Sequence, residues 1–187
     1  MNRRDVLKSS SLILGYAITG GTAVAVLNGC TVDKTPDWVP MNLSHEQAVL
    51  AEHLAETILP ASTSGKPGAT DAQVVRFIDA VLDSYAPEEK TAFIDNLSLF
   101  DSMAMKKYDT GYTQLDQDQR LEVMEDMMGG DPMQRKAFRD FRGNTIVGFC
   151  YSEVGAKQVL KFDPVPGHPY QGCIDFEDVG TIWSITR

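Results

Sequence analysis

The sequence predicts an all-α protein: a single compact helical domain of about five to six helices with an irregular C-terminal segment, preceded by an export signal. Three observations lead to this fold class. From residue 43 to about residue 160, apolar residues recur every three or four positions, which is the period of an α-helix. No run alternates between apolar and polar residues over the length of a strand. Prolines, glycines and N-capping residues stand where the helical periods begin and end.

The first helix is predicted to start after Ser44. Ser44 is an N-capping residue, and Gln47 stands three residues later, where a capping box needs it. Pro60 ends this helix, and a loop rich in Ser, Gly and Pro follows over residues 61–69. The apolar face of the helix consists of Leu50, Leu54, Ala55 and Ile58.

Two further helices follow this loop. Thr70 or Asp71 is predicted to cap the second helix, which ends near Tyr85. Pro87 suits the first turn of a third helix, which runs to about Lys107. The apolar faces are Val74, Val75, Ile78, Val81 and Leu82 in the second helix, and Phe93, Leu97, Phe100 and Ala104 in the third.

The remaining helices are expected between residues 116 and 160. Asp116 opens a fourth helix that stops at Gly129-Gly130, and Asp131-Pro132 starts a fifth. Residues 153–160 are expected to form one more short helix. The prolines within residues 163–169 prevent regular structure, and the tail that follows is irregular. The apolar faces are Leu121, Met124, Met127 and Met128 in the fourth helix, and Phe138, Phe141, Thr145 and Phe149 in the fifth.

Residues 1–29 have the pattern of an export signal. Arg3 and Arg4, followed by Leu7, resemble the twin-arginine motif, an address that moves proteins already folded. No Asp, Glu, Lys or Arg occurs from residue 9 to residue 32, and the apolar stretch is diluted by glycines and hydroxyl residues. A permanent membrane-spanning helix is the alternative, for which the length would suffice. The dilution favours a signal over a permanent span.

The segment Leu27-Asn28-Gly29-Cys30 resembles a lipobox, whose cysteine takes a lipid and becomes the mature N-terminus. An ordinary cleavage site with a chance cysteine nearby is the alternative. With a lipobox, the chain divides into a signal peptide (1–29), an exposed tether (30–42) and a helical domain (43–187). The location then expected is the periplasm, with the protein anchored to the membrane through the lipid on Cys30.

The charge of the mature chain excludes two classes of partner. Removing residues 1–29 takes three of the 17 basic residues and one of the 26 acidic residues. The 14 basic and 25 acidic residues that remain give a net charge of −11. Nucleic-acid binding needs a basic footprint, so no nucleic-acid partner is expected. Electrostatic binding to anionic lipid is excluded for the same reason.

Cys150 and Cys173 are the cysteines that follow Cys30. In an exported protein two such cysteines can form a disulfide, and closing a loop of this size would stabilise the fold by about 3 kcal/mol. Two separate buried thiols are the alternative.

No catalytic, cofactor-binding or metal-binding residue can be assigned from the sequence. The segment His45-Glu46-Gln47-Ala48-Val49 begins like a zinc-protease helix but has Val49 where the second His must be. The patterns Glu-x-x-His, Cys-x-x-Cys-His and Gly-x-Gly-x-x-Gly are absent. Twin-arginine export typically serves cofactor-loaded proteins. We therefore hypothesise that the chain folds onto a second, cofactor-bearing protein that lacks a signal of its own.

Several segments resemble a known family. The first helix ends in Glu56-Thr57-Ile58-Leu59-Pro60, and residues 148–156 read GFCYSEVGA. Together with the leader, these segments resemble the gluconate 2-dehydrogenase subunit 3 family. Pro164-Val165-Pro166-Gly167, Gly172-Cys173 and Trp183 are similar to the sugar-dehydrogenase branch of that family.

The resemblance implies a non-catalytic small (gamma) subunit without a cofactor of its own. In that family the small subunit accompanies a large FAD-dependent oxidoreductase of the glucose–methanol–choline class, often with a cytochrome c that receives the electrons. The large subunit oxidises a sugar or sugar-acid hydroxyl, and the small subunit assists its folding and export.

Contacts with such a partner are expected in the segments that are rich in Pro and aromatic residues. Such segments are poorly suited to a helical core but well suited to a protein–protein interface. The predicted contact residues are Tyr151, Ser152, Glu153, Pro166, His168, Tyr170 and Trp183. Packing over the domain's own helices is the alternative for them. Two other functions stay open: an independent periplasmic helical metalloprotein enzyme, and a lipid-anchored structural protein without an oxidoreductase partner.

Overall fold

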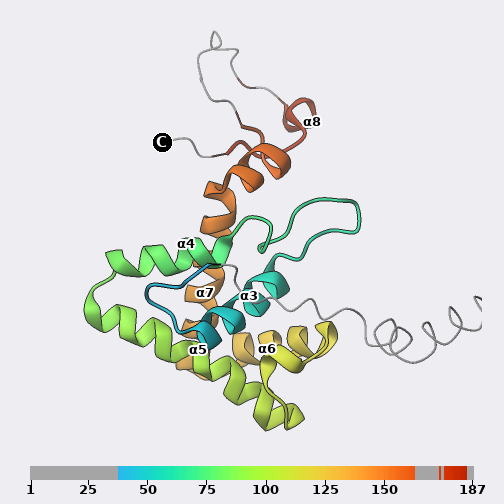
Figure 1. The fold of residues 1–187 in the computed structure, drawn as a ribbon. Helices are drawn as coiled ribbons and strands as arrows, with labels where there is room; N and C mark the ends of the chain where they lie inside the picture. Colours follow the sequence, from blue (N-terminus) through green and yellow to red (C-terminus); the bar gives the residue numbers. More distant parts are fainter. Residues whose placement is uncertain (1–37, 163–172, 174, 185–187) are drawn as a thin grey trace, which may run out of the picture. The chain divides into compact units, whose positions relative to one another are not determined.

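The computed structural model describes residues 38–162, 173 and 175–184, which belong to a compact unit spanning Thr35–Arg187. Five longer helices make up most of it: α3 (His45–Ile58), α4 (Val74–Val81), α5 (Pro87–Tyr108), α6 (Gln117–Gly129) and α7 (Pro132–Tyr151) (Figure 1). Shorter elements are η1 (Leu82–Ser84), η2 (Tyr112–Gln114), η3 (Gly155–Val159) and α8 (Phe176–Val179). Within these ranges no strand ladder forms, and the prediction of an all-α fold is confirmed.

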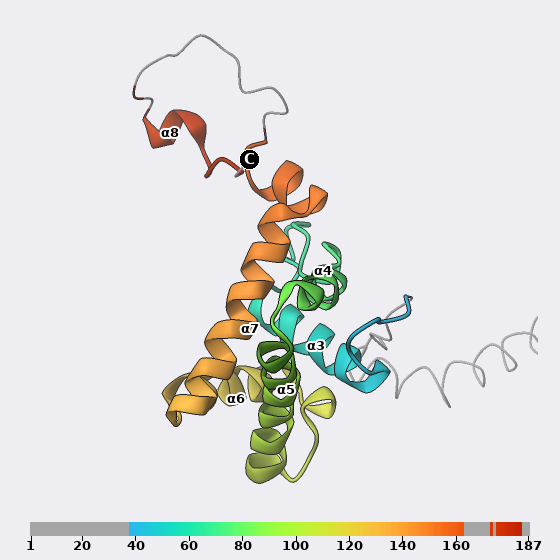
Figure 2. The same cartoon turned by 90° about the vertical axis from the view of Figure 1, so that its left-hand side faces the viewer.

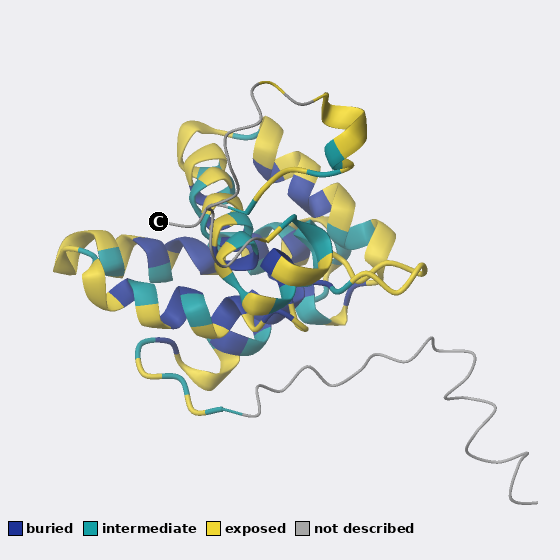
Figure 3. Cartoon of the chain, turned by 90° about the horizontal axis from the view of Figure 1, so that it is seen from above, coloured by how far each residue is buried: buried dark blue, intermediate teal, exposed yellow. Residues whose placement is uncertain are grey.

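Helix α7 is the centre of the fold, because it packs against α3, α4, α5 and α6. Its side chain Phe141 is 1% exposed and lies within 6.3 Å of the ring of Phe93 and 6.1 Å of the ring of Phe100, measured between centroids. Such aromatic pairs contribute about 0.5–1.5 kcal/mol each beyond their burial. Figure 3 shows the buried residues gathered where the helices face one another and the exposed ones on the outer faces.

The helix starts follow the capping chemistry of the sequence. Ser44 accepts a hydrogen bond from the backbone N–H of Gln47 at 3.1 Å, and the Gln47 side chain accepts one from the backbone N–H of Ser44 at 2.8 Å. Asp116 and Asp131 form the same reciprocal boxes at the starts of α6 and α7. Pro87 occupies the first turn of α5. These four predicted helix starts are confirmed.

The predicted start of the second helix is wrong. Helix α4 begins at Val74 and has Gln73 as its N-cap, with φ of 52°, rather than Thr70 or Asp71. The Thr70 hydroxyl instead donates to Glu56 at 2.9 Å, and Asp71 accepts from the backbone N–H of Gly68 at 2.8 Å. Both side chains therefore hold the loop before α4 and are not available as caps.

The predicted apolar face of the fourth helix is partly wrong. Met124 and Met127 are buried as expected, but Leu121 and Met128 are exposed. Val123, which is fully buried, completes the inner face of α6 instead. The packing of α6 against both α5 and α7 sets this face, and periodicity alone did not reveal it.

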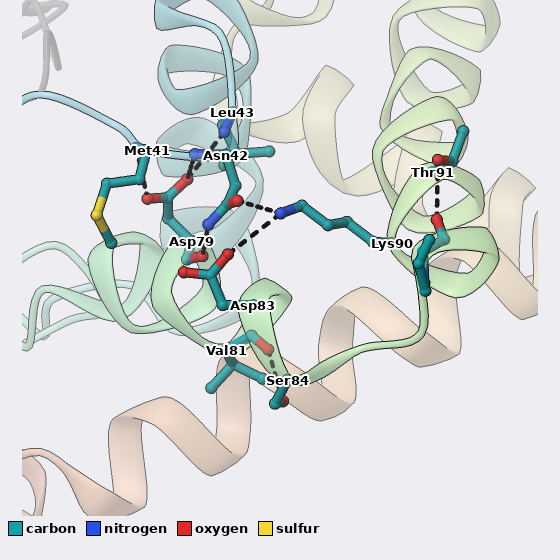
Figure 4. Close-up of polar contacts among 10 residues, drawn as sticks. Met41, Asn42, Leu43, Asp79, Val81, Asp83, Ser84, Lys90 and Thr91 are labelled. Carbon is teal, nitrogen blue, oxygen red and sulfur yellow. Dashed lines mark hydrogen bonds and ion pairs between the residues drawn. The ribbon is translucent and has the colours of Figure 1, made fainter.

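The segment that leads into α3 is fixed to the domain by Asp79, a buried residue of α4 (Figure 4). One carboxylate oxygen accepts hydrogen bonds from the backbone N–H groups of Asn42 at 3.0 Å and Leu43 at 2.9 Å. The other accepts from the backbone N–H of Met41 at 2.9 Å. We call this arrangement the Asp79 latch.

The latch shortens the predicted tether. Trp38 packs partly buried against the core, so residues 38–42 lie on the domain rather than free of it. Lys90 of α5 supports this segment by donating to the Asn42 side chain and, at 3.2 Å, to Asp83. The folded domain therefore begins before residue 43, because residues 38–42 already pack on it.

We expect Asp79→Ala to lower the free energy of unfolding by about 3 kcal/mol, because it leaves buried backbone donors without an acceptor. Urea denaturation of the full chain measures this. Asp83→Ala is the matched control: Asp83 is exposed and forms only a surface ion pair with Lys90, so the loss should stay below about 1 kcal/mol. Equal losses in the two variants would contradict the latch.

Candidate partner-binding surface

A groove lies between α4 and the C-terminal end of α7. It encloses about 530 Å³ and is lined from α4 by Arg76 and Phe77 and from the end of α7 by Tyr151. A second hollow of about 400 Å³ adjoins it, since Asp71 and Val154 line both. We call the two together the α4–α7 groove.

The groove depends on a close approach of α4 to α7. Gly148 faces Phe77, and a Cβ atom at residue 148 would stand 2.7 Å from the Phe77 ring. Any larger residue at this position would force the Phe77 ring to move. Glycine at residue 148 therefore sets the floor of the groove.

The chain turns sharply at the end of α7, and Ser152 shapes that turn. Its hydroxyl donates to the Phe149 carbonyl at 2.7 Å and accepts from the backbone N–H of Gly155 at 2.9 Å. Gly155 opens η3, a π-helical turn, and a Cβ atom there would stand 2.0 Å from the Phe149 oxygen. Turns of this type occur frequently at functional sites. The short helix predicted over residues 153–160 takes this form.

The structure brings three of the predicted contact residues together, because Tyr151, Ser152 and Glu153 all line the groove. Tyr151 is 53% exposed, whereas Ser152 is half-buried and engaged in the turn. Glu153 is exposed and accepts from Lys157 at 2.6 Å, and this hydrogen bond holds the pKa of the Glu153 carboxyl below its usual range. Tyr151 and Glu153 are therefore accessible, whereas Ser152 fixes the turn between them through its hydrogen bonds to Phe149 and Gly155.

The remaining predicted contacts lie farther along the chain. Trp183 is described and is 46% exposed. Pro166, His168 and Tyr170 lie outside the described residues. The same holds for the leader positions, Arg3, Arg4 and Leu7, and for Cys30.

We call the described residues 161–162, 173 and 175–184 the C-terminal arm, and backbone hydrogen bonds pair its first residue with its last residues. The N–H of Lys161 donates to the carbonyl of Ile182 at 3.0 Å, and the N–H of Ser184 donates to the carbonyl of Lys161 at 2.8 Å. The Lys161 ammonium also lies 4.6 Å from the centroid of the Trp183 ring. In Figures 1 and 2, the α8 part of the arm lies beyond the C-terminal end of α7.

The arm exposes large apolar side chains. Phe176 is 65% exposed, Ile182 68% and Phe162 36%, and α8 contains no buried residue. Trp183 is the residue of this region that the sequence predicts as a contact, whereas Phe176 and Ile182 were not predicted. The signal that could have found them is the presence of large apolar residues in a segment without helical periodicity.

Cys150 and Cys173 are both free thiols in the structure, the first half-buried and the second exposed. Their pairing is therefore not formed here and stays a prediction from the sequence.

The family-like segment at the end of α3 has a structural role beside the groove. Glu56 accepts hydrogen bonds from the backbone N–H groups of Ala61 at 3.0 Å and Thr70 at 3.1 Å. Thr57 accepts one from the hydroxyl of Tyr112, a fully buried residue whose pKa is raised by that burial. The Glu56 contacts hold the loop between α3 and α4 that forms one wall of the groove, and the Thr57 contact joins α3 to η2.

In the described part of the chain, no group of three or more His, Cys, Asp or Glu side chains is placed to hold a metal ion. No helix there combines the length and the apolar character that crossing a bilayer requires. The groove and the arm both expose aromatic side chains, which are enriched at protein–protein interfaces.

The family model described as gluconate 2-dehydrogenase subunit 3 matches residues 45–167. The chain belongs to the gluconate 2-dehydrogenase subunit 3 family. The name of this family describes a subunit of a gluconate 2-dehydrogenase. The matched region contains α3 to η3 and therefore the whole α4–α7 groove, whereas α8 and Trp183 lie beyond it. No curated protein and no solved structure matches the chain.

We expect Gly155→Ala to lower the free energy of unfolding by about 2 kcal/mol or more, because the new methyl group collides with the Phe149 carbonyl. Thermal unfolding followed by circular dichroism measures the change. Gly143→Ala in the middle of α7 is the matched control: its methyl group meets no atom within 4 Å. A gain of about 0.5–1 kcal/mol from helix propensity is expected there. Two changes of the same sign would contradict the strained turn.

Proposed function

We propose that the protein is the non-catalytic small subunit of an exported FAD-dependent dehydrogenase that acts on a sugar or on a sugar acid such as gluconate. It assists folding of the flavoprotein large subunit and its co-export by the twin-arginine route. The FAD belongs to the large subunit, of the glucose–methanol–choline class; complexes of this family often include a cytochrome c that receives the electrons. Family membership supports the role of a subunit, and the C-terminal arm is the observation that carries the docking role.

The arm has the physical character of one half of an interface. Its backbone is hydrogen-bonded at Lys161, yet Phe176 and Ile182 remain mostly exposed and Trp183 is about half exposed. Large apolar side chains that are exposed within one short segment often mark a protein-binding site. Aromatic anchors of this kind dominate the affinity of protein interfaces, and a partner that covered them would remove the unfavourable exposure.

The α4–α7 groove supplies a second docking element. Tyr151 stands at the C-terminal end of α7, and η3 connects that end to the start of the arm at residue 161. A large subunit that docks on the arm therefore has an amphipathic tyrosine and the exposed Glu153 nearby along the chain. The groove lies within the region shared by the family, which supports a role common to its members.

The leader explains how the complex reaches its compartment. Arg3, Arg4 and Leu7 serve as the export address for both subunits, because the twin-arginine route carries folded proteins. After cleavage, a lipid on Cys30 anchors the complex at the membrane in the periplasm. Because the mature chain is negatively charged, it is not attracted to anionic lipid, and its attachment to the membrane depends on the lipid on Cys30.

Substituting Trp183→Ala together with Phe176→Ser should abolish docking, because it removes the two aromatic anchors of the arm. The tagged chain is purified from its native host, and co-purification of a protein with the flavin absorbance spectrum and sugar-dehydrogenase activity is measured. The matched control is Leu121→Ser with Met128→Ser, which removes two exposed apolar side chains from α6, toward the other end of α7 (Figures 1 and 2). Dehydrogenase activity in the pure chain, without partner or flavin, would overturn the proposal.

Changing Arg3→Lys together with Arg4→Lys should leave the flavoprotein in the cytoplasm, because the export receptor reads the arginine pair. Flavin-dependent dehydrogenase activity in periplasmic and cytoplasmic fractions measures this. The control Lys8→Arg alters a neighbouring cation and should preserve export. Normal export and maturation of the flavoprotein beside the doubly substituted chain would refute the shared address.

A further inference from the structure

The place where the chain enters the domain presents two apolar side chains to solvent. Val39 is 88% exposed and Met41 is 73% exposed, the two highest values among the exposed large apolar residues of the described chain. Trp38, between them and the leader, is only half-buried. We call residues 38–41 the entry corner.

The entry corner is held by the structure rather than by a free linker. The backbone N–H of Met41 donates to the buried Asp79 carboxylate, and Trp38 packs against the core. Figure 4 shows the Met41 backbone bound to Asp79 while its side chain extends away from Lys90. The exposure of Val39 and Met41 is therefore a consequence of the fold, and these side chains do not turn inward to escape water.

Chain length places this corner within reach of a membrane. Val39 lies nine positions after Cys30, and an extended chain spans at most about 3.3–3.6 Å per residue, so the backbone of Val39 stays within roughly 32 Å of that of Cys30. A tether this short makes contact with the bilayer intramolecular, at an effective concentration on the order of millimolar. Two side chains that would not bind a membrane alone can then remain in contact with it.

Charge decides the kind of contact. The mature chain carries a net charge of −11, and Lys90, which contacts this segment, is engaged with Asn42 and Asp83. Attraction to anionic headgroups therefore does not hold the corner. The contact must be apolar, with the side chains inserted at the level of the headgroups of neutral lipid.

We propose that the entry corner is a lipid-contact site, in which Val39 and Met41 insert into the surface of the bilayer that anchors Cys30. This rests on the lipid attachment in the proposed function. It fixes the orientation of the domain, because the side that carries residues 38–41 faces the membrane.

The test uses Trp38 as the reporter. The chain has two tryptophans and three cysteines, so Trp183→Phe leaves Trp38 alone, and Cys150→Ser with Cys173→Ser leaves Cys30 as the single thiol. The chain from Cys30 onward, which contains the whole compact unit, is coupled through Cys30 to a maleimide lipid in phosphatidylcholine vesicles. Vesicles with brominated acyl chains should quench Trp38 fluorescence about twofold relative to unbrominated ones, because insertion places the corner at the headgroup–acyl boundary.

Val39→Ser with Met41→Ser should remove this quenching. Leu121→Ser with Met128→Ser, which deletes two exposed apolar side chains elsewhere, should leave it intact. Thermal unfolding of each variant verifies that the domain is folded.

The proposal is overturned if the coupled protein floats with the vesicles but Trp38 is not quenched, or if the substitutions at residues 39 and 41 leave the quenching unchanged. Loss of flavoprotein co-purification in the same variant, without lipid quenching in the parent, would assign the corner to the protein partner instead. Chemical coupling does not depend on acylation in the cell. That acylation is measured separately, as the mass of the N-terminal peptide of protein purified from the host. Failure of the lipid anchor and failure of the lipid contact are therefore distinguishable.

Discussion

The fold depends on one helix that serves both the core and the surface. In its middle, α7 buries Phe141 among the aromatic residues of α5, and it contacts all four of the other long helices. At its C-terminal end it carries Tyr151, the Ser152 turn and the connection through η3 to the arm. Docking elements mounted on a helix fixed by four neighbours are held in position more firmly than elements on loops.

The sequence predicts the helices well because their signals are local. Capping residues such as Ser44 and Asp131 act within one turn, and their partners stand three residues away. It fails where a distant contact decides. Thr70 does not cap α4, because Glu56 lies fourteen positions earlier and engages it. Val123 rather than Leu121 is buried, because two neighbouring helices define the inner face of α6.

The candidate site was only partly predictable for the same reason. Tyr151 and Glu153 lie in a recognisable family segment, but their opposite wall, Arg76 and Phe77, comes from another helix. Sequence composition marked the end of the chain as unsuited to the core, yet it could not separate Trp183, which contacts Lys161, from the more exposed Phe176. The matched region of the family contains the groove and ends at residue 167, so α8 and Trp183 lie beyond the part of the chain that the family model matches.

The Asp79 latch also determines how the domain responds to mechanical force. A force on the N-terminal segment does not act first on the N-terminal turn of α3, because three hydrogen bonds to Asp79 hold residues 41–43. The load passes from there into α4, which is braced against α7, the most widely supported helix of the domain. A force applied to the N-terminal segment is therefore shared with the core helices before it reaches the first turn of α3.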